Sequence, residues 1–197
     1  MAAKNMDNQS ALVDKRAAAD AIISQKLQME RSPAWPQMEK VFRAKNPKCQ
    51  ACNETQELNV HHMYPFHYVV LCGRPDLELD ERNLMTLCTR QDTEHHILLG
   101  HLDDFESYNP DVKQFVKTYA GKSNQQIRAD AAFQTAHAAK PKHIDLMSDA
   151  EQTNFKTILD VKFPINPVVK AKADEARAKL AQHTTPGAQP AQPGAGS

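Results

Sequence analysis

Residues that can bind metal or move protons are concentrated in one stretch of this chain. The sequence holds nine histidines and four cysteines. The histidines that crowd the middle of the chain are His61, His62, His67, His95, His96 and His101. A neutral imidazole can be a metal ligand or a general base near neutral pH, and a cysteine thiolate is a strong metal ligand. We therefore expect the chemistry of the protein to lie in this stretch.

Cys49 and Cys52 have the C-x2-C spacing of a zinc knuckle. A structural zinc site takes four nitrogen or sulfur ligands in a tetrahedral arrangement, and a knuckle supplies two of them from one turn. Cys88 can supply the third, and His95 or His96 the fourth, so the spacing predicts a Cys3His site for structural Zn²⁺. Cys72 has no partner at a useful spacing, and we expect a buried or loop thiol there; its use as a ligand in place of His95 is the less favoured alternative.

His61 and His62 are adjacent in a segment that is compatible with a strand. Two such histidines can divide metal binding and proton abstraction between them. Neighbours on a strand point to opposite faces, so both can serve one cleft only if the strand ends or distorts there, which Pro65 favours. Taken alone, the pair is explained more simply as one core and one surface histidine.

Four motifs follow one another in a specific order. They are Cys49-x2-Cys52, Val60-His61-His62-x2-Pro65, Asn83-Leu84-x3-Cys88, and His95-His96 at the expected start of a helix. This order and spacing resemble the HNH endonucleases, a family with a ββα-metal fold. The resemblance covers residues 35–110, less than half of the chain, and it favours a functional histidine pair. Segments 100–102 and 107–110 are similar to extensions of phage and bacterial members.

The resemblance implies a role for each matched residue. His61 and His96 would bind a catalytic divalent ion, Mg²⁺ or another, and His62 would be the general base that activates water. Asn83 would orient the strand of His62 through backbone hydrogen bonds. The implied activity is metal-dependent hydrolysis of phosphodiester bonds in DNA, which we expect to be double-stranded. Such a reaction needs a base for the water and a cation beside the scissile phosphate.

The chain departs from the family pattern at two positions. His95 stands where many members have the last cysteine of a second C-x2-C pair, so histidine replaces cysteine as the fourth zinc ligand or the zinc site is lost. His101 lies five residues after His96, about 140° round an ideal α-helix. We expect His101 to be a ligand only if Gly100 lets the helix deform; local hydrogen bonding is an equal alternative. His67 is a weaker candidate for the cleft.

Basic side chains near the expected cleft are candidates for phosphate contacts. They are Lys45, Lys48, Arg82 and Arg90, with Trp35 and Tyr64 as candidates for sugar or base contacts. Charged residues near any site are more often a solvated surface. Residues 31–110 carry an excess of acidic over basic side chains, whereas residues 111–182 carry the reverse. We therefore expect weak, salt-sensitive DNA binding that the C-terminal helices assist.

The expected elements define an α+β fold, a small ββα-metal core with a zinc knuckle, flanked by N-terminal and C-terminal α-helices. Strands are expected over 58–63 and 83–87, separated by a long loop. Helices are expected over 11–30, 37–45, 111–120, 124–139, 149–160 and 168–182, and Ser123 and Ser148 begin two of them as capping boxes. The domain boundaries follow: an N-terminal helical arm (1–32), a nuclease core (33–110), a C-terminal helical extension (111–182) and a disordered tail (183–197).

Length and composition restrict the domain organisation and the class of protein. The chain has 197 residues, a formal net charge of zero and few aromatic residues, so one compact domain with appendages is expected and a large multi-domain enzyme is excluded. A secretory signal and a membrane span are both absent from the pattern, which predicts a soluble, cytoplasmic protein without a membrane partner. Two other functions remain open. One is a zinc-stabilised nucleic-acid or protein-binding module without catalysis, and the other is a thiol redox protein that uses the C-x2-C pair.

Overall fold

The computed structural model describes residues 30–90 and 92–183. The helix predicted over 11–30 lies outside this part of the chain except for Glu30, and so does the predicted tail except for His183. Residues 30–32, the end of the expected helical arm, have no helical structure. Among the described residues, no helix combines the length and the apolar character that crossing a bilayer requires.

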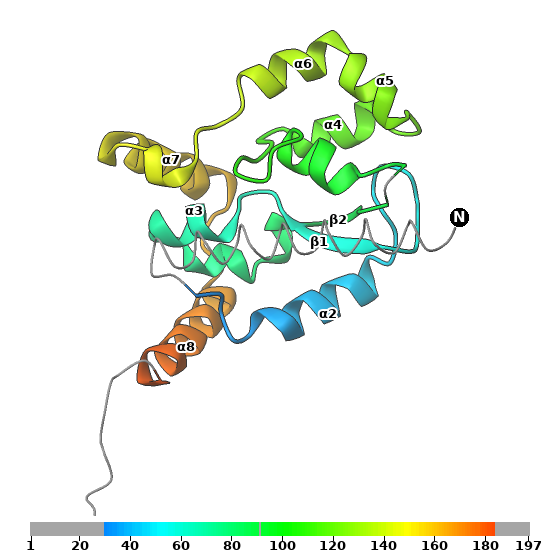
Figure 1. Ribbon diagram of the computed structural model, residues 1–197. Helices are drawn as coiled ribbons and strands as arrows, with labels where there is room; N and C mark the ends of the chain where they lie inside the picture. The colour runs from blue at the N-terminus through cyan, green and yellow to red at the C-terminus, as the bar shows by residue number, and fades with distance from the viewer. Residues whose placement is uncertain (1–29, 91, 184–197) are drawn as a thin grey trace, which may run out of the picture.

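A two-stranded antiparallel sheet lies among helices and short helical turns, which confirms the α+β class (Figure 1). The elements are, in chain order, α2 (Trp35–Lys45), β1 (Leu58–His62), α3 (Phe66–Leu71), the 3₁₀ turns η1 (Pro75–Glu78) and η2 (Glu81–Asn83), β2 (Leu84–Cys88), the π-helical turn η3 (His96–Gly100), α4 (Val112–Thr118), α5 (Asn124–Ala129), α6 (Ala131–Ala138), the 3₁₀ turn η4 (Ile144–Leu146), α7 (Asp149–Lys162) and α8 (Pro167–His183).

The register of the sheet places the histidine pair of β1 and the zinc-ligand candidate Cys88 at opposite ends of the sheet. His62 at the end of β1 lies opposite Leu84 at the start of β2, and Leu58 lies opposite Cys88. Every residue of β2 is buried. The strand is apolar except for Thr86, whose hydroxyl donates to the carbonyl of Asn46. Burial on both faces explains this composition, because a strand with one solvated face would alternate polar and apolar residues.

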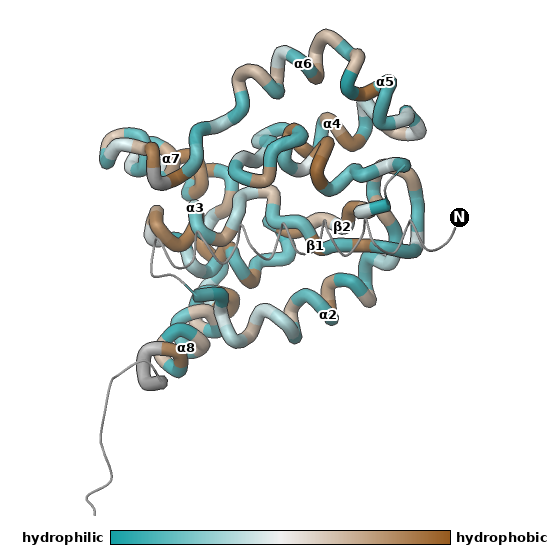
Figure 2. Tube along the Cα trace, in the orientation of Figure 1, coloured by the Kyte–Doolittle hydropathy of each residue, from teal (hydrophilic) through white to brown (hydrophobic). Residues whose placement is uncertain are grey.

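Helices cover both faces of the sheet. On one face, Trp35 and Phe42 of α2 pack with Val60, Leu84 and Ala173, the last from α8. On the other face, Met85 and Leu87 belong to a larger core that includes residues of η3 and α4. Figure 1 shows α2 and α4 on opposite sides of the strands. Figure 2 shows α3 as one of the most hydrophobic stretches, whereas α2 and α8 mix hydrophilic and hydrophobic residues.

Residues after position 110 share this core with the residues before it. Phe155 and Phe163, in and just after α7, pack against the ring of Tyr64 with centroids 5.7 Å apart in each case. Helix α3 contacts α7, and η1 contacts α8. The segments expected as nuclease core and helical extension therefore share the larger of the two hydrophobic clusters.

Two expected elements differ in the structure. The connection between the strands, expected as a long loop, contains α3, η1 and η2, because six residues of α3 are too few for a helical period to be seen in the sequence. The helix expected over 124–139 is divided at Asp130, whose backbone is extended (ψ 128°) and whose carboxylate caps α6 by accepting from the amides of Ala132 and Phe133. The capping boxes at Ser123 and Ser148 are both confirmed.

Arg74 is buried and joins η1 to α7. Its guanidinium donates to both carboxylate oxygens of Asp76, at 3.0 and 2.8 Å, and to Asp160 Oδ1 at 2.8 Å. It also donates to the carbonyl oxygen of Phe163 at 3.0 Å. A guanidinium stays charged when buried, so each of these acceptors compensates for water lost on folding. The arginine therefore fixes the C-terminal helices against the turn that follows α3.

We expect Arg74→Ala to lower the free energy of unfolding by about 3–5 kcal/mol, because it leaves the buried Asp76 carboxylate without its partner. Urea denaturation followed by circular dichroism measures the change. Arg43→Ala is the matched control, because Arg43 forms an exposed pair with Glu39, and its effect should stay below about 1 kcal/mol. Equal effects of the two variants would contradict the structural role of Arg74.

Candidate functional site

The three cysteines and the histidine predicted to share a zinc ion lie together. Cys49, Cys52, Cys88 and His95 each offer a ligand atom, and these atoms all lie within 4.8 Å of one another. Cys49 and Cys52 come from a tight turn that Asn53 closes with φ 62°. The amide of Gln50 in this turn donates to Thr86 O at 3.0 Å, which attaches the turn to β2 beside Cys88. This cluster could hold a metal ion.

Two of the three distances within the cluster match a small tetrahedral ion, and the third, from His95 Nδ1 to Cys88 Sγ, is shorter. Cys52 Sγ lies 3.8 Å from Cys88 Sγ, and His95 Nδ1 lies 3.6 Å from Cys49 Sγ and 3.2 Å from Cys88 Sγ. In a tetrahedron with Zn–S of about 2.3 Å and Zn–N of about 2.0–2.1 Å, ligand atoms are separated by roughly 3.6–3.8 Å. Cys72, which is buried elsewhere, does not belong to the cluster.

Thiol ionisation in this cluster depends on whether a metal ion is bound. The hydrogen bond with Cys49 and burial raise the pKa of Cys88 to about 11. Burial also raises the pKa of Cys52, whereas the hydrogen bond from Cys88 lowers that of Cys49. Protein groups alone therefore do not stabilise three thiolates at neutral pH. A bound metal ion does so by direct coordination.

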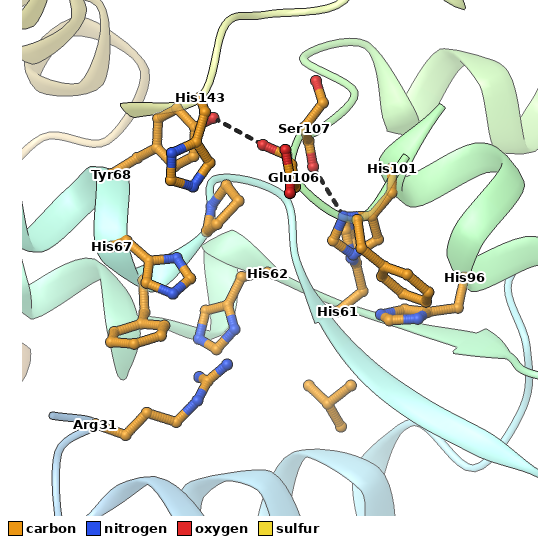
Figure 3. A pocket seen from close by; sticks show the side chains of 14 residues that line it. Arg31, His61, His62, His67, Tyr68, His96, His101, Glu106, Ser107 and His143 are labelled. Atoms are coloured by element: carbon orange, nitrogen blue, oxygen red, sulfur yellow. Dashed lines mark hydrogen bonds between the residues drawn. The ribbon is translucent and has the colours of Figure 1, made fainter. Parts of the chain in front are cut away.

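A second cluster consists of His61, His96 and His101, whose ligand atoms also lie within 4.8 Å of one another. The ring centroids of His61 and His101 are 4.9 Å apart, as are those of His96 and His101 (Figure 3). The sequence predicts that His101 reaches a metal site only if the helix is deformed. It is deformed, because η3 is a π-helical turn rather than an α-helical one. Its wider i→i+5 turn places residues five apart on the same face. This cluster, too, could hold a metal ion.

Backbone contacts orient the imidazole of His101. Nδ1 of His101 lies 2.8 Å from the carbonyl oxygen of Ser107, marked by a dashed line in Figure 3. A carbonyl oxygen only accepts, so Nδ1 carries the hydrogen and the neutral ring has its lone pair on Nε2. An imidazole that donates one nitrogen to a carbonyl and offers the other to a cation is the usual arrangement at metal sites.

Gly100 is required by the close approach of His61. A Cβ added at position 100 would lie 2.8 Å from Cε1 and 3.0 Å from Nδ1 of the His61 ring. Real Cβ atoms do not approach other atoms so closely, so any larger residue must displace the ring or the π-helical turn. Besides standing in the deformed turn, the glycine therefore serves close packing between β1 and η3.

His62 lies on the opposite face of β1 from His61, beside α2. Its ring packs on Trp35 with centroids 4.3 Å apart, and its Nε2 lies 3.0 Å from the carbonyl oxygen of Glu78. The carbonyl again accepts, so Nε2 carries the hydrogen and the neutral ring has its lone pair on Nδ1. Because β1 ends at His62, both histidines line one cavity even though they project from opposite faces.

Asn83 is fully buried, and its side chain forms hydrogen bonds with backbone groups. Its Oδ1 accepts from the amide of Tyr64 at 2.9 Å, and its Nδ2 donates to the carbonyls of Tyr64 and Leu77, at 3.0 Å each. These bonds fix the chain two residues after His62. Asn83 is thus placed as a positioning residue, the role that the family resemblance implies for it.

A small cavity of about 50 Å³ lies between the histidines. Its walls include the two histidines of β1, together with His96 and His101 in and just after η3. They also include His67 of α3 and two residues that sequence reasoning missed, Arg31 and His143 (Figure 3). Arg31 falls in the expected N-terminal arm, and His143 lies in the connection between α6 and η4. No local pattern in the sequence indicates that either one reaches the cavity.

The basic residues expected to contact phosphate do not line this cavity. Arg82 binds the buried carboxylate of Asp80, and Arg90 binds Glu54 and Asp92. Lys45 forms an exposed pair with Glu81, and Lys48 is exposed. The partners Asp80 and Asp92 lie two residues from their arginines in the sequence. The pairs Lys45–Glu81 and Arg90–Glu54 join residues 36 positions apart, which only the fold brings together.

The aromatic residues expected to contact sugar or base are both buried. Trp35 is 7% exposed and covers the ring of His62, while Tyr64 is 4% exposed and accepts a hydrogen bond from Lys162 at 2.6 Å. Their rings are used for packing, so neither offers a face to a nucleic acid.

Comparison with known proteins adds no assignment. Neither a family model nor a curated protein nor a solved structure matches this chain.

We expect Cys88→Ser to remove the metal ion bound by the cysteine cluster, because the cluster then retains only three of its ligands. Cys72→Ser is the matched control, since Cys72 is a buried thiol outside the cluster, and it should keep the full metal content. Elemental analysis of the purified proteins measures the ratio of metal to chain. Equal metal content in the two variants would contradict the assignment of Cys88.

We expect Gly100→Ala to weaken divalent-ion binding at the three histidines by roughly tenfold or more, because overpacking a close contact costs about 1–3 kcal/mol. Calorimetric titration with Mn²⁺ measures the affinity. The metal content of the cysteine cluster and the circular dichroism spectrum should stay as in the wild type. An unchanged Mn²⁺ affinity would mean that the ring of His61 is not a ligand in its present position.

Proposed function

We propose that this protein is a metal-dependent endonuclease of the HNH type, with a ββα-metal core and a structural zinc ion, that hydrolyses phosphodiester bonds in double-stranded DNA. The single observation that carries the proposal is the cavity between the strand end and the π-helical turn. The imidazoles of His61, His96 and His101 come together at one side of it, and His62 lies at the other. A site that only binds nucleic acid has no need for this combination.

The residues present fit a divalent ion. Three imidazoles converge, and a backbone carbonyl sets the tautomer of His101 so that its Nε2 lone pair can be a ligand. When bound by His61, His96 and His101, the ion would stabilise negative charge on the scissile phosphate and on the leaving oxygen. This assignment adds His101 to the two ligands that the family resemblance implies.

His62 is the general base of the proposed mechanism. The Glu78 carbonyl holds the hydrogen on Nε2, so Nδ1 is the nitrogen that accepts a proton from the attacking water. Packing against Trp35 fixes the plane of the ring. Asn83 fixes the backbone that follows the histidine pair. It thereby keeps the base in a constant position relative to the three imidazoles.

The cysteine cluster has a structural role in this proposal. Zinc held by Cys49, Cys52, Cys88 and His95 would join the knuckle, the end of β2 and the segment that leads into η3. His95 immediately precedes His96, so the structural ion would also set the position of a ligand of the catalytic ion. Metal binding of this kind contributes directly to folding in small domains.

The proposal predicts that His62→Ala lowers the rate of Mg²⁺- or Mn²⁺-dependent nicking of a supercoiled plasmid by roughly 10²-fold or more, the usual scale for loss of a general base. Zinc content and DNA affinity should stay near the wild-type values. His61→Ala should also lower the rate, and a higher metal concentration should restore part of it, because this variant weakens the ion site instead of removing the base.

Two outcomes would contradict the proposal. Nicking by His62→Ala at the wild-type rate would exclude the histidine as base. Wild-type protein that binds DNA yet cuts neither DNA nor RNA with Mg²⁺, Mn²⁺, Ni²⁺ or Zn²⁺ would favour the other function considered, a zinc-stabilised binding module.

A further inference from the structure

The cavity beside the histidines is lined by groups that carry or can carry positive charge. Its described walls include six histidines and Arg31, against one acidic residue, Glu106. If three of the imidazoles hold a divalent ion, the positive charge grows further. An enclosed site of one sign attracts a ligand of the opposite sign, because water cannot screen the field there as it does at an open surface.

Arg31 has a fixed place at one side of this cavity. Its guanidinium carbon lies 4.3 Å from the ring centroid of Phe66 and 5.4 Å from that of Trp35. Figure 3 shows the guanidinium directed to the side where His62 and His67 lie. Aromatic faces attract a guanidinium without cancelling its charge, so the group is held in position and stays cationic.

A buried carboxylate anchors the segment that carries Arg31. Glu78 is fully buried, and its Oε1 accepts from the amide of Ser32 at 3.0 Å while its Oε2 accepts from Arg177 of α8 at 3.1 Å. The backbone carbonyl of the same residue accepts from His62. One residue therefore fixes the segment of Arg31, the C-terminal helix and the imidazole of His62 relative to one another.

We propose that the Arg31 side of the cavity, together with His67, is a phosphate-binding subsite whose ligand is a phosphodiester of a nucleic acid. The planar guanidinium offers paired N–H donors that match two phosphate oxygens, and His67 can add a third donor. The inference rests on the proposed function for its choice of ligand. It assigns the anion contact to a residue outside the motifs that resemble HNH endonucleases.

Titration with dimethyl phosphate, a minimal phosphodiester, tests the subsite in the full chain. Binding is followed through the NMR signals of the histidine imidazoles at one fixed, saturating Mg²⁺ concentration. Arg31→Met should weaken the apparent affinity by roughly tenfold or more, the scale of lost charge-assisted hydrogen bonds. Arg31→Lys keeps the charge but not the paired donors and should fall between Met and the wild type. Arg43→Met is the matched control, because Arg43 is exposed on α2, and it should bind as the wild type does.

The outcomes separate the subsite from the nuclease. Equal affinities of Arg31→Met and the wild type, or a wild type that does not respond to the diester, would overturn the subsite even if plasmid nicking is observed. A response to inorganic phosphate alone would overturn the choice of a phosphodiester. Arg31-dependent binding of dimethyl phosphate supports the subsite even in a protein that nicks no DNA, in which case only the nuclease proposal fails.

Discussion

The buried amide of Asn83 is the interaction on which the arrangement of the cavity depends. It satisfies the amide and carbonyl of Tyr64 and the carbonyl of Leu77 at once, in a place that excludes water. Each of those groups, if buried without a hydrogen bond, would destabilise the folded state by about 1–3 kcal/mol. The hydrogen bonds of Asn83 therefore stabilise this geometry. The consequence is that β1 ends at His62, η1 lies beside it, and Glu78 at the end of η1 can hold the imidazole.

A π-helical turn brings His96 and His101 to the same side of the chain. Residues five apart diverge on an α-helix, yet His96 and His101 both face His61 because η3 is wound more widely. The turn is compatible with a ring packed directly on its backbone only because position 100 has no side chain. The convergence of the three imidazoles therefore depends on both the π-helical turn and the absence of a side chain at position 100.

Charge is distributed unevenly in a chain whose formal net charge is zero. Surface arginines and lysines near the sheet are mostly paired with carboxylates, whereas the cavity gathers histidines and Arg31. A polyanion would thus meet a weakly charged surface and a cavity whose fixed positive charge is that of Arg31, to which a bound divalent ion would add. In this arrangement, affinity for nucleic acid would come mainly from the site itself, and the approach of the substrate would receive little long-range electrostatic assistance.

The sequence by itself determined the features that depend on local spacing. The C-x2-C turn, the two capping boxes and the α+β order of elements are all readable because they involve neighbours along the chain. The tertiary structure alone decided what depends on distant segments. It places Arg31 and His143 at the cavity, pairs Arg90 with Glu54, and lets η3 bring His101 to His61. These outcomes follow from packing between elements far apart in sequence, and such packing leaves no periodic signal in the order of residues.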